Sequence, residues 1–466
     1  MAGFTEESIQ RVRDALDIVQ VAEVYLTLKR SGSAYKALCP FHNEKTPSFQ
    51  VNPELDIFKC FGCGEGGDIF RFVMKIEGVT FPEAVEMLAE RAGVTLERTG
   101  GGREDRGAGE RKTRIFWVTS KAMAWFEDRL ADEREGRDAR EYLLDRGFSM
   151  ETIRAWRLGW APDRYGALQE HLVRESGGKR EAVVEHALEA GLLRESQDGD
   201  VYEFAGVRGR VIFPILDLQQ RAIGFGGRLL KEDPEKKVGK YINSPQTRLF
   251  DKSRVLFGLN AAAKEIRLTG AAIVVEGYTD VIMCHQHGIR NVVATLGTAL
   301  TPEHVRLLRR FADSVIARFD ADEAGANATD KAIRTFVEAD MPLRIIRSEE
   351  IKDACEFLPA RGADAFRAEV DEAEDAFGYH FRQCFERAEL RSVDDREAAV
   401  RRAMELVALS PNATKREMLR QQVASRAGIP LAALPEVKPR RAAPEGRGRA
   451  GGTRPEPGGR RDGWRG

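Results

Sequence analysis

Apolar residues recur at helical spacing in several parts of the chain. Near the N-terminus, a helix is predicted from about Thr5 by apolar residues three or four positions apart, namely Ile9, Val12, Leu16 and Val19. Thr80 and Glu83 form a capping box that predicts the start of another helix, and Gly93 marks its end. Residues 363–428 carry helical patterns throughout.

Short β-branched apolar runs alternate with helical patterns from about 270 to 348. Ile273–Val275 and Val315–Phe319 are typical of buried parallel strands. Between them, Thr301 is a predicted N-cap with Pro302 at the first helical position. This alternation predicts a parallel sheet covered by helices.

The chain is long enough for more than one domain, and changes in composition suggest where it divides. Residues 99–113 are rich in glycine and charge, which predicts a flexible linker. We expect a multidomain α/β and α+β protein with an N-terminal module (1–98), this linker, a mixed part with a basic groove (114–269), a parallel-sheet core (270–357), a helical subdomain (358–435) and a disordered Arg/Gly/Pro-rich tail (436–466).

The overall charge does not favour any class of partner. The chain has 73 Lys and Arg against 74 Asp and Glu, so any nucleic-acid surface has to be local. We find no apolar run long enough to span a membrane and no signal peptide, and we expect a soluble, cytoplasmic protein. In that compartment, the six cysteines are expected to bind metal or to be buried thiols.

Four of the potential metal ligands occur in two close pairs. Cys39 and His42 form C-x₂-H, and Cys60 and Cys63 form C-x₂-C. Thiolate and imidazole ligands in this arrangement favour tetrahedral Zn²⁺ with no open coordination position. We therefore predict a structural zinc site.

Aromatic and basic residues alternate around the predicted zinc site. The aromatics are Tyr35, Phe41, Phe49, Phe58 and Phe61, and the lysines are Lys36, Lys45 and Lys59. Such a mixture is suited to stacking on single-stranded bases while neutralising phosphates. Packing of the aromatics around the metal explains the pattern equally well.

Carboxylates follow both predicted parallel strands. Glu276 comes directly after the first strand, and Asp320 and Asp322 come after the second. Two such charges 4 Å apart repel by roughly 4 kcal/mol at an effective dielectric of about 20. A divalent cation relieves this repulsion, and Mg²⁺ favours carboxylates together with phosphate oxygens. We predict a Mg²⁺ site for phosphoryl transfer; the alternative is acids that only cap helices or face water.

A basic segment precedes these acids. Residues 210–228 read as two strands joined at Asp217–Gln220. Glycines beside Arg228 and Lys240 would let a phosphate group approach the backbone closely. The alternative is an ordinary charged hairpin surface.

Taken together, these motifs resemble bacterial DNA primases of the DnaG type. LCPFHNEKTPSF (38–49) and FKCFGCGEGGDIFRFVM (58–74) resemble the CHC2-type zinc-binding domain of that family. RGRVIFPI, IGFGGR, KYINSPQT, VVEGYTD, ATLGTALT and FDADEAG resemble its RNA polymerase domain, including the toprim fold. The resemblance implies that Glu276, Asp320 and Asp322 bind catalytic metal. It also implies an active-site groove for nucleotide and template that contains Asp280, Arg228, Lys240, Tyr241, Asn243 and Lys252, with Asp280 and Lys240 among the catalytic residues.

The resemblance also implies an activity and partners. The activity is that of a nucleotidyltransferase that synthesises short RNA primers de novo on single-stranded DNA from ribonucleoside triphosphates during replication. The cofactors are structural Zn²⁺ and catalytic Mg²⁺ or Mn²⁺; the partners are template, nucleotides, replicative helicase and single-strand binding protein, without a membrane. The alternatives are a toprim nuclease or topoisomerase and a non-catalytic DNA-binding scaffold. The basic segment 208–257 favours a primase over both.

The chain departs from the family pattern in its last acidic motif. Where the family has Asp-Pro-Asp, this chain has Asp353, a further metal ligand by the resemblance, followed by Cys355 in place of the second acid. A thiol is a poor ligand for Mg²⁺. We expect Cys355→Asp to leave primer synthesis equal or to raise it.

The chain also departs from the family pattern at its C-terminal end. The family continues past the polymerase domain into a helical domain that docks on the helicase. About 30 residues follow Pro435, too few for such a domain. We therefore expect this chain to lack the usual helicase-binding domain.

Overall fold

The computed structural model describes residues 3–42, 44, 46–77, 79–97, 103–196, 198–204, 208–230, 239–319, 323–347, 353–386 and 392–435. Of residues 103–110, 323 and 324 it describes the backbone alone. Within these ranges, no helix combines the length and the apolar character needed to cross a bilayer.

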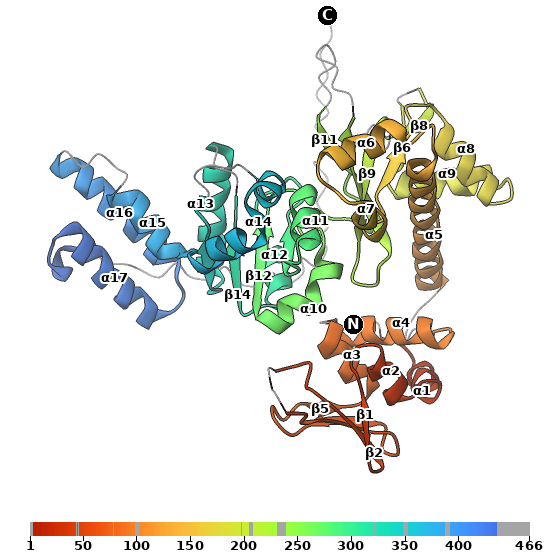
Figure 1. The fold of residues 1–466 in the computed structure, drawn as a ribbon, viewed down its shortest axis with the longest axis horizontal. Helices are drawn as coiled ribbons and strands as arrows, with labels where there is room; N and C mark the ends of the chain where they lie inside the picture. Colours follow the sequence, from red (N-terminus) through yellow and green to blue (C-terminus); the bar gives the residue numbers. More distant parts are fainter. Residues whose placement is uncertain are drawn as a thin grey trace, which may run out of the picture.

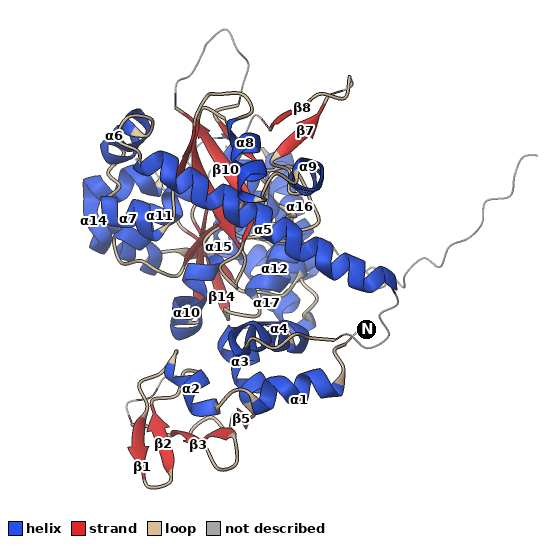
Figure 2. Cartoon of the chain, turned by 90° about the vertical axis from the view of Figure 1, so that its right-hand side faces the viewer, coloured by secondary structure: helices blue, strands red, loops and turns tan. Residues whose placement is uncertain are grey.

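The N-terminal residues form a module of helices and one antiparallel sheet. The sheet has the order β1-β2-β3-β4-β5 and lies below the helices in Figure 2. The helices are α1 (Glu6–Asp14), α2 (Ile18–Glu23), α3 (Ile69–Glu77) and α4 (Phe81–Ala92), and the strands are β1 (Lys29–Ser31), β2 (Ala34–Ala37), β3 (Phe49–Asn52), β4 (Ile57–Cys60) and β5 (Gly66–Gly67).

The helix starts predicted in this module are confirmed, with one added break. Thr5 caps α1 by accepting the Ser8 N–H at 3.2 Å, and the Glu83 carboxylate accepts the Thr80 N–H at 2.7 Å at the start of α4. The apolar pattern predicted to continue to Val19 is divided between α1 and α2. The reason is Asp17, whose carboxylate accepts the Val19 N–H and so caps a new helix.

The next helix begins inside the segment predicted to be a flexible linker. Helix α5 (Arg103–Ala131) contains residues 103–113, whose backbone is therefore helical. Lys, Arg and Glu in this stretch are good helix formers, which offsets a cost of about 1 kcal/mol for each internal glycine. Arg111 also forms ion pairs with Glu185, at 2.9 Å, and Glu189, both on α9 (Arg180–Glu189).

A second sheet, packed beside α5, has the strand order β11-β10-β9-β6 and is antiparallel. Strands β9 and β10 form the predicted hairpin, in which the Asp217 carboxylate accepts the N–H groups of Gln219 and Arg221 at 3.0 and 2.9 Å. The elements of this part are α6 (Arg137–Asp145), α7 (Met150–Ala155), β6 (Gly159–Ala161), α8 (Ala167–Glu175), β7 (Leu193–Glu195), β8 (Val201–Glu203), β9 (Arg210–Leu216), β10 (Ala222–Leu229) and β11 (Tyr241–Asn243).

The predicted parallel sheet follows, with the order β13-β12-β14-β15-β16, in which β16 alone pairs antiparallel. Val274 pairs with Val293 on one side and with Ala317 on the other, so the carboxyl ends of these strands lie along one edge. The elements are α10 (Leu259–Thr269), β12 (Ala271–Val275), α11 (Tyr278–Gln286), β13 (Val292–Ala294), α12 (Pro302–Leu308), β14 (Ser314–Ala317), α13 (Glu323–Glu338), β15 (Leu343–Ile345), α14 (Ala354–Asp371) and β16 (Glu374–Asp375). Thr301 and Pro302 start α12 as predicted.

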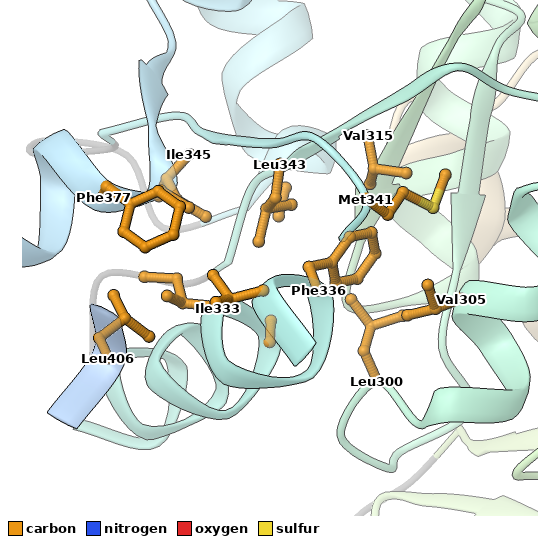
Figure 3. Packing of buried hydrophobic residues seen from close by; sticks show 14 of the residues in the cluster. Leu300, Val305, Val315, Ile333, Phe336, Met341, Leu343, Ile345, Phe377 and Leu406 are labelled. Atoms are coloured by element: carbon orange, nitrogen blue, oxygen red, sulfur yellow. The ribbon is translucent and has the colours of Figure 1, made fainter. Parts of the chain in front are cut away.

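The remaining helices extend away from this sheet, at the left of Figure 1. They are α15 (Ala376–Phe385), α16 (Val393–Leu409) and α17 (Ala413–Ala427), followed by a 3₁₀ turn at Leu431–Ala433. They share a core with the parallel sheet, because Phe377 and Leu406 belong to the same buried cluster as Ile333 and Ile345 (Figure 3).

The N-terminal module contacts the rest of the chain at the tip of the β9–β10 hairpin. Leu218 packs against the core of the N-terminal module and also against the core of the parallel sheet. Glu83 of α4 forms an ion pair with Arg310, just after α12, at 3.6 Å. The module, the hairpin and the parallel sheet therefore meet at one place.

Candidate functional site

The four predicted zinc ligands converge. Cys39, His42, Cys60 and Cys63 place one ligand atom each within 4.8 Å of one another. The Sγ atoms of Cys39 and Cys63 are 3.9 Å apart, and Sγ of Cys60 is 3.8 Å from Nδ1 of His42. Tetrahedral bonds of about 2.3 Å to Zn²⁺ require sulfur atoms roughly 3.8 Å apart. The side chains therefore fit a zinc ion.

Glu44, which was not predicted from the sequence, supports these ligands without being one of them. Its carboxylate accepts the N–H groups of Cys39 and Ser48 at 2.7 and 3.1 Å. It also lies 3.3 Å from Nε2 of His42, so that Nδ1 faces the cysteines. A carboxylate on the outer nitrogen of a ligand histidine fixes the ring and raises its basicity. The only signal for Glu44 in the sequence was its position two residues after the histidine.

The aromatic residues around the zinc ligands divide into two groups. Phe49 and Phe58 are fully buried, with ring centroids 5.3 Å apart, and pack in the core of the module. Phe61 is 69% exposed, on the turn between two zinc ligands. Core packing thus explains Phe49 and Phe58, whereas Phe61 is available for stacking on a base. Lys45 lies outside the described residues.

The acids predicted to bind Mg²⁺ are only partly described. Glu276 follows β12 directly, at the carboxyl edge of the parallel sheet. Strand β14 ends beside it at Ala317, whereas Asp320 and Asp322 lie outside the described residues.

A cavity of about 690 Å³ lies at this edge, between β11 and the ends of β12 and β13. It is lined by Arg146, Lys240, Tyr241, Ile242, Asn243, Lys252, Glu276, Gly277, Tyr278, Thr279, Asp280, Thr295, Leu296, Gly297, Asp353 and Glu356. The fold therefore brings together most of the predicted site residues that it describes. Carboxylates and cations share the wall, which suits a ligand that carries both phosphate and a divalent cation. The carboxylate oxygens are hard donors of the kind that Mg²⁺ and Mn²⁺ bind.

Arg228 does not reach this cavity, although the sequence predicted it there. It is only 7% exposed and lies between the rings of Tyr142 and Tyr241, with its guanidinium carbon 5.4 and 5.2 Å from the two centroids. It pairs with Tyr241 across β10 and β11. Arg228 therefore supports the Tyr241 ring from behind.

Two charged residues of the cavity were not predicted from the sequence. Arg146 follows helix α6 as its C-cap, where a cation is common for reasons of helix stability alone. Glu356 stands in the first turn of α14, next to the cysteine that replaces the second acid. The motif around Cys355 was a signal for Glu356, whereas no pattern in the sequence indicated Arg146.

Asp280 lines the cavity, and backbone N–H groups hold its carboxylate in place. It is 5% exposed, its Oδ2 accepts the Gly277 N–H at 3.1 Å, and its Oδ1 accepts the Cys355 N–H at 3.0 Å. These bonds connect the turn after Glu276 to the start of α14. Asp280 therefore fixes the backbone that carries Glu276 and Asp353.

Cys355 is a core residue next to Asp280. The residue is 4% exposed and packs in the cluster that includes Phe357 and Met283. Burial, and then the charge of Asp280, raise the pKa of Cys355 to about 12, so the thiol is neutral. Asp353 does line the cavity, and its carboxylate caps α14 by accepting the Glu356 N–H at 2.8 Å.

Family models cover most of the chain. They are described as CHC2 zinc finger (residues 4–104), DNA primase catalytic core, N-terminal domain (125–263), Toprim-like (273–358) and DnaB-helicase binding domain of primase (379–432). The last match shows that the expected absence of a helicase-binding domain was wrong. The expectation placed such a domain after Pro435, whereas the match falls on helices α15 to α17, which precede that residue.

Similar proteins agree with these matches. The DNA primase of Clostridium acetobutylicum is 38% identical over 391 residues, which cover 83% of this chain and 62% of that protein. The chain thus spans less than two thirds of the length of this relative.

Among solved structures, the Aquifex aeolicus primase (zinc-binding and RNA polymerase domains) is 33% identical with a TM-score of 0.60, covering 92% of this chain and 98% of that one. A DnaG primase catalytic domain bound to single-stranded DNA is 31% identical with a TM-score of 0.61, covering 69% and 98%. The zinc ribbon, the toprim sheet and the helical C-terminal region recur in this order. The chain therefore belongs to the bacterial DNA primase (DnaG) family.

Proposed function

We propose that this chain is a primase, a DNA-directed RNA polymerase that starts short RNA primers on single-stranded DNA from ribonucleoside triphosphates. The observation that carries the proposal is the cavity in which the carboxylates at the end of β12 and the start of α14 face the cations around β11. A site for a nucleoside triphosphate needs carboxylates for its divalent cation and cationic side chains for its phosphates. Membership of the primase family supports this choice over other uses of a toprim sheet.

In the proposed reaction, the 3′-hydroxyl of the growing primer attacks the α-phosphorus in line, and pyrophosphate leaves. Lys240, Lys252 and Arg146 bind the triphosphate or template phosphates and neutralise charge on the leaving pyrophosphate. Tyr241 and Asn243 line the groove beside them, and Arg228 holds the Tyr241 ring in place.

The proposed ligands of Mg²⁺ or Mn²⁺ are Glu276, Asp320 and Asp322, with Asp353 as a further ligand. Such an ion, when bound, lowers the pKa of the attacking hydroxyl and neutralises charge on the transferring phosphorus. Asp280 keeps Glu276 and Asp353 in register through its two backbone hydrogen bonds.

The N-terminal module is proposed to hold structural Zn²⁺ and to contact the template. Phe61 and Lys59 are exposed beside the zinc ligands, as stacking on single-stranded bases requires. The relative bound to single-stranded DNA supports this template for the polymerase domain. We further propose that helices α15 to α17 bind the replicative helicase, and that the protein works in the cytoplasm with single-strand binding protein.

The test is primer synthesis from labelled ribonucleotides on single-stranded DNA. Glu276→Gln and Asp320→Asn should abolish primers, because each removes one charge from the metal site while keeping the shape of the side chain. Glu303→Gln is the matched control, because Glu303 pairs with Arg306 on α12 and does not line the cavity.

Two results would overturn the proposal. Primer yields at the wild-type level in both acid variants would leave the protein as a DNA-binding scaffold. Cleaved or relaxed DNA without primers would indicate a nuclease or a topoisomerase.

A further inference from the structure

One fully buried arginine joins three backbone carbonyls next to the cavity. Arg210, the first residue of β9, is 0% exposed. Its guanidinium donates to the carbonyl oxygens of Gly227, Gly239 and Lys240 at 3.2, 2.8 and 2.9 Å. The first carbonyl belongs to β10, and the other two belong to the residues that lead into β11.

Burial of this charge has a cost that these carbonyls offset. Burial, and then the charge of Arg228, lower the pKa of Arg210. An isolated buried cation is strongly unfavourable, and the planar guanidinium carries several N–H donors in a fixed fork. This fork allows the single side chain to bind a carbonyl of β10 together with the carbonyls of the two residues that lead into β11.

The carbonyls that Arg210 binds determine where Lys240 lies. Lys240 directly precedes β11, which is three residues long and stands at the edge of its sheet. Its carbonyl also accepts the Leu229 N–H at 2.9 Å, and its neighbour Tyr241 pairs with Arg228. The Lys240 backbone is therefore fixed from two sides, and its exposed side chain lines the cavity.

We propose that Arg210 is a positioning residue for nucleotide binding: its guanidinium fixes the backbone at Gly239 and Lys240 and thereby places the Lys240 ammonium in the cavity. The inference rests on the proposed role of Lys240 in binding nucleoside triphosphate. Arg210 itself does not line the cavity. Its contribution to nucleotide affinity is therefore exerted through Lys240.

A double-mutant cycle on the full-length chain tests this dependence. The variants are Arg210→Lys, Lys240→Ala and the pair, and the measurement is the Kd for ATP by calorimetry with MgCl₂. Lysine keeps the charge of Arg210 but concentrates its donors on one atom, so it cannot bind the carbonyls on both strands. A misplaced Lys240 loses one charge-assisted hydrogen bond to a triphosphate oxygen, which corresponds to about a tenfold change in the Kd.

We expect Arg210→Lys to raise the Kd for ATP about tenfold in the wild-type background and less than twofold in the Lys240→Ala background. Arg208→Lys is the matched control. Arg208 lies two residues earlier, pairs with Asp163 at 3.0 Å and stacks on Tyr165, so its replacement should leave the Kd unchanged. The same pattern should appear in the KM for ATP of primer synthesis, with kcat less affected.

Two failures are distinguishable. If the Arg210→Lys effect is as large without the Lys240 side chain as with it, Arg210 acts on the fold and the inference is overturned. If Lys240→Ala alone leaves the Kd for ATP unchanged, the role proposed for Lys240 fails. Should Arg210→Lys not fold, Arg210→Gln is measured in the same cycle and decides by the same criterion.

Discussion

Tyr278 donates its hydroxyl to Oδ1 of Asn243 at 2.7 Å, and this hydrogen bond joins β11 of the antiparallel sheet to the start of α11, which follows the parallel strand β12. Asn243 belongs to β11, and its Nδ2 donates in turn to the Leu296 carbonyl after β13 at 2.9 Å. Gly226 on β10 leaves room for the ring, because a Cβ there would lie 2.7 Å from Cζ of Tyr278. These contacts therefore fix the distance between β11, which Lys240 directly precedes, and the edge of the parallel sheet that carries Glu276.

Tyr278→Phe should lower the free energy of unfolding by about 1 kcal/mol, because it removes this hydrogen bond and keeps the packing of the ring. Urea denaturation followed by circular dichroism measures the change. Tyr165→Phe is the control, since Tyr165 is 71% exposed and its phenyl ring is retained. Equal effects of the two substitutions would show that the connection between the sheets adds nothing to stability.

Glu44→Gln should weaken zinc binding by about 10- to 100-fold, because an amide orients and polarises the His42 ring less well than a carboxylate does. Competition with a chromophoric chelator measures zinc affinity directly. Glu54→Gln, an exposed position on the loop between β3 and β4, is the control. Wild-type zinc affinity in the Glu44 variant would refute the role of Glu44 in orienting His42.

His285→Gln should make stability less dependent on pH. The His285 ring packs edge-on against Trp156, its Nε2 donates to the Val292 carbonyl at 3.1 Å, and burial lowers its pKa to about 4. In the unfolded chain His285 has its ordinary pKa near 6.5, so between that pH and pH 4 it binds a proton that it does not bind in the folded chain. The contribution of His285 to the free energy of unfolding is therefore fully present above about pH 6.5 and decreases by about 3 kcal/mol as the pH falls toward 4.

The measurement for His285 is urea unfolding at pH 7 and pH 5. Wild type should lose about 2 kcal/mol more than His285→Gln between these values. His287→Gln, two residues further along, is the control and should behave as wild type does. Parallel losses in wild type and in the His285 variant would contradict the prediction.

Cys355→Asp should destabilise the fold by roughly 2–4 kcal/mol, because it places a carboxylate in the core beside Asp280. The loss should be smaller at low pH, where the new carboxyl is protonated. Primer yield per folded molecule should be equal to wild type or higher, as expected from the sequence. Cys355→Ser controls for loss of the thiol, and a large drop in yield from folded Cys355→Asp protein would refute the expectation on activity.

Features that depend on neighbouring residues in the chain could be predicted from the sequence. The zinc ligands come in two pairs with two residues between the members of each, so the approach of the members within a pair needs only a tight turn. The helix starts at Thr80 and Thr301 follow from the side chains of the first turn alone. The parallel strands were visible because they are buried on both faces and so are continuously apolar.

Features that depend on the assembled fold could not be predicted from the sequence. Arg146 reaches the cavity from a helix end about a hundred residues before Lys240 and Glu276, and nothing local marks it. Arg228 was misplaced because β10 is buried on both faces, and an unbroken apolar strand does not reveal which way a charged side chain turns. The segment 99–113 was predicted to be a linker from composition, whereas ion pairs of Arg111 with α9 stabilise it as helix from Arg103 on.

The β9–β10 hairpin reaches from the N-terminal module to β11, the strand that lines the cavity. Leu218 at its tip is held between two cores, and Arg210 and Arg228 stand at its other end, more than about 25 Å away along the strands. The two strands are hydrogen-bonded along this length, with one shift of register between Ala222 and Gly224. One hairpin therefore contacts the N-terminal module at its tip and, at its other end, pairs with the strand that Lys240 directly precedes.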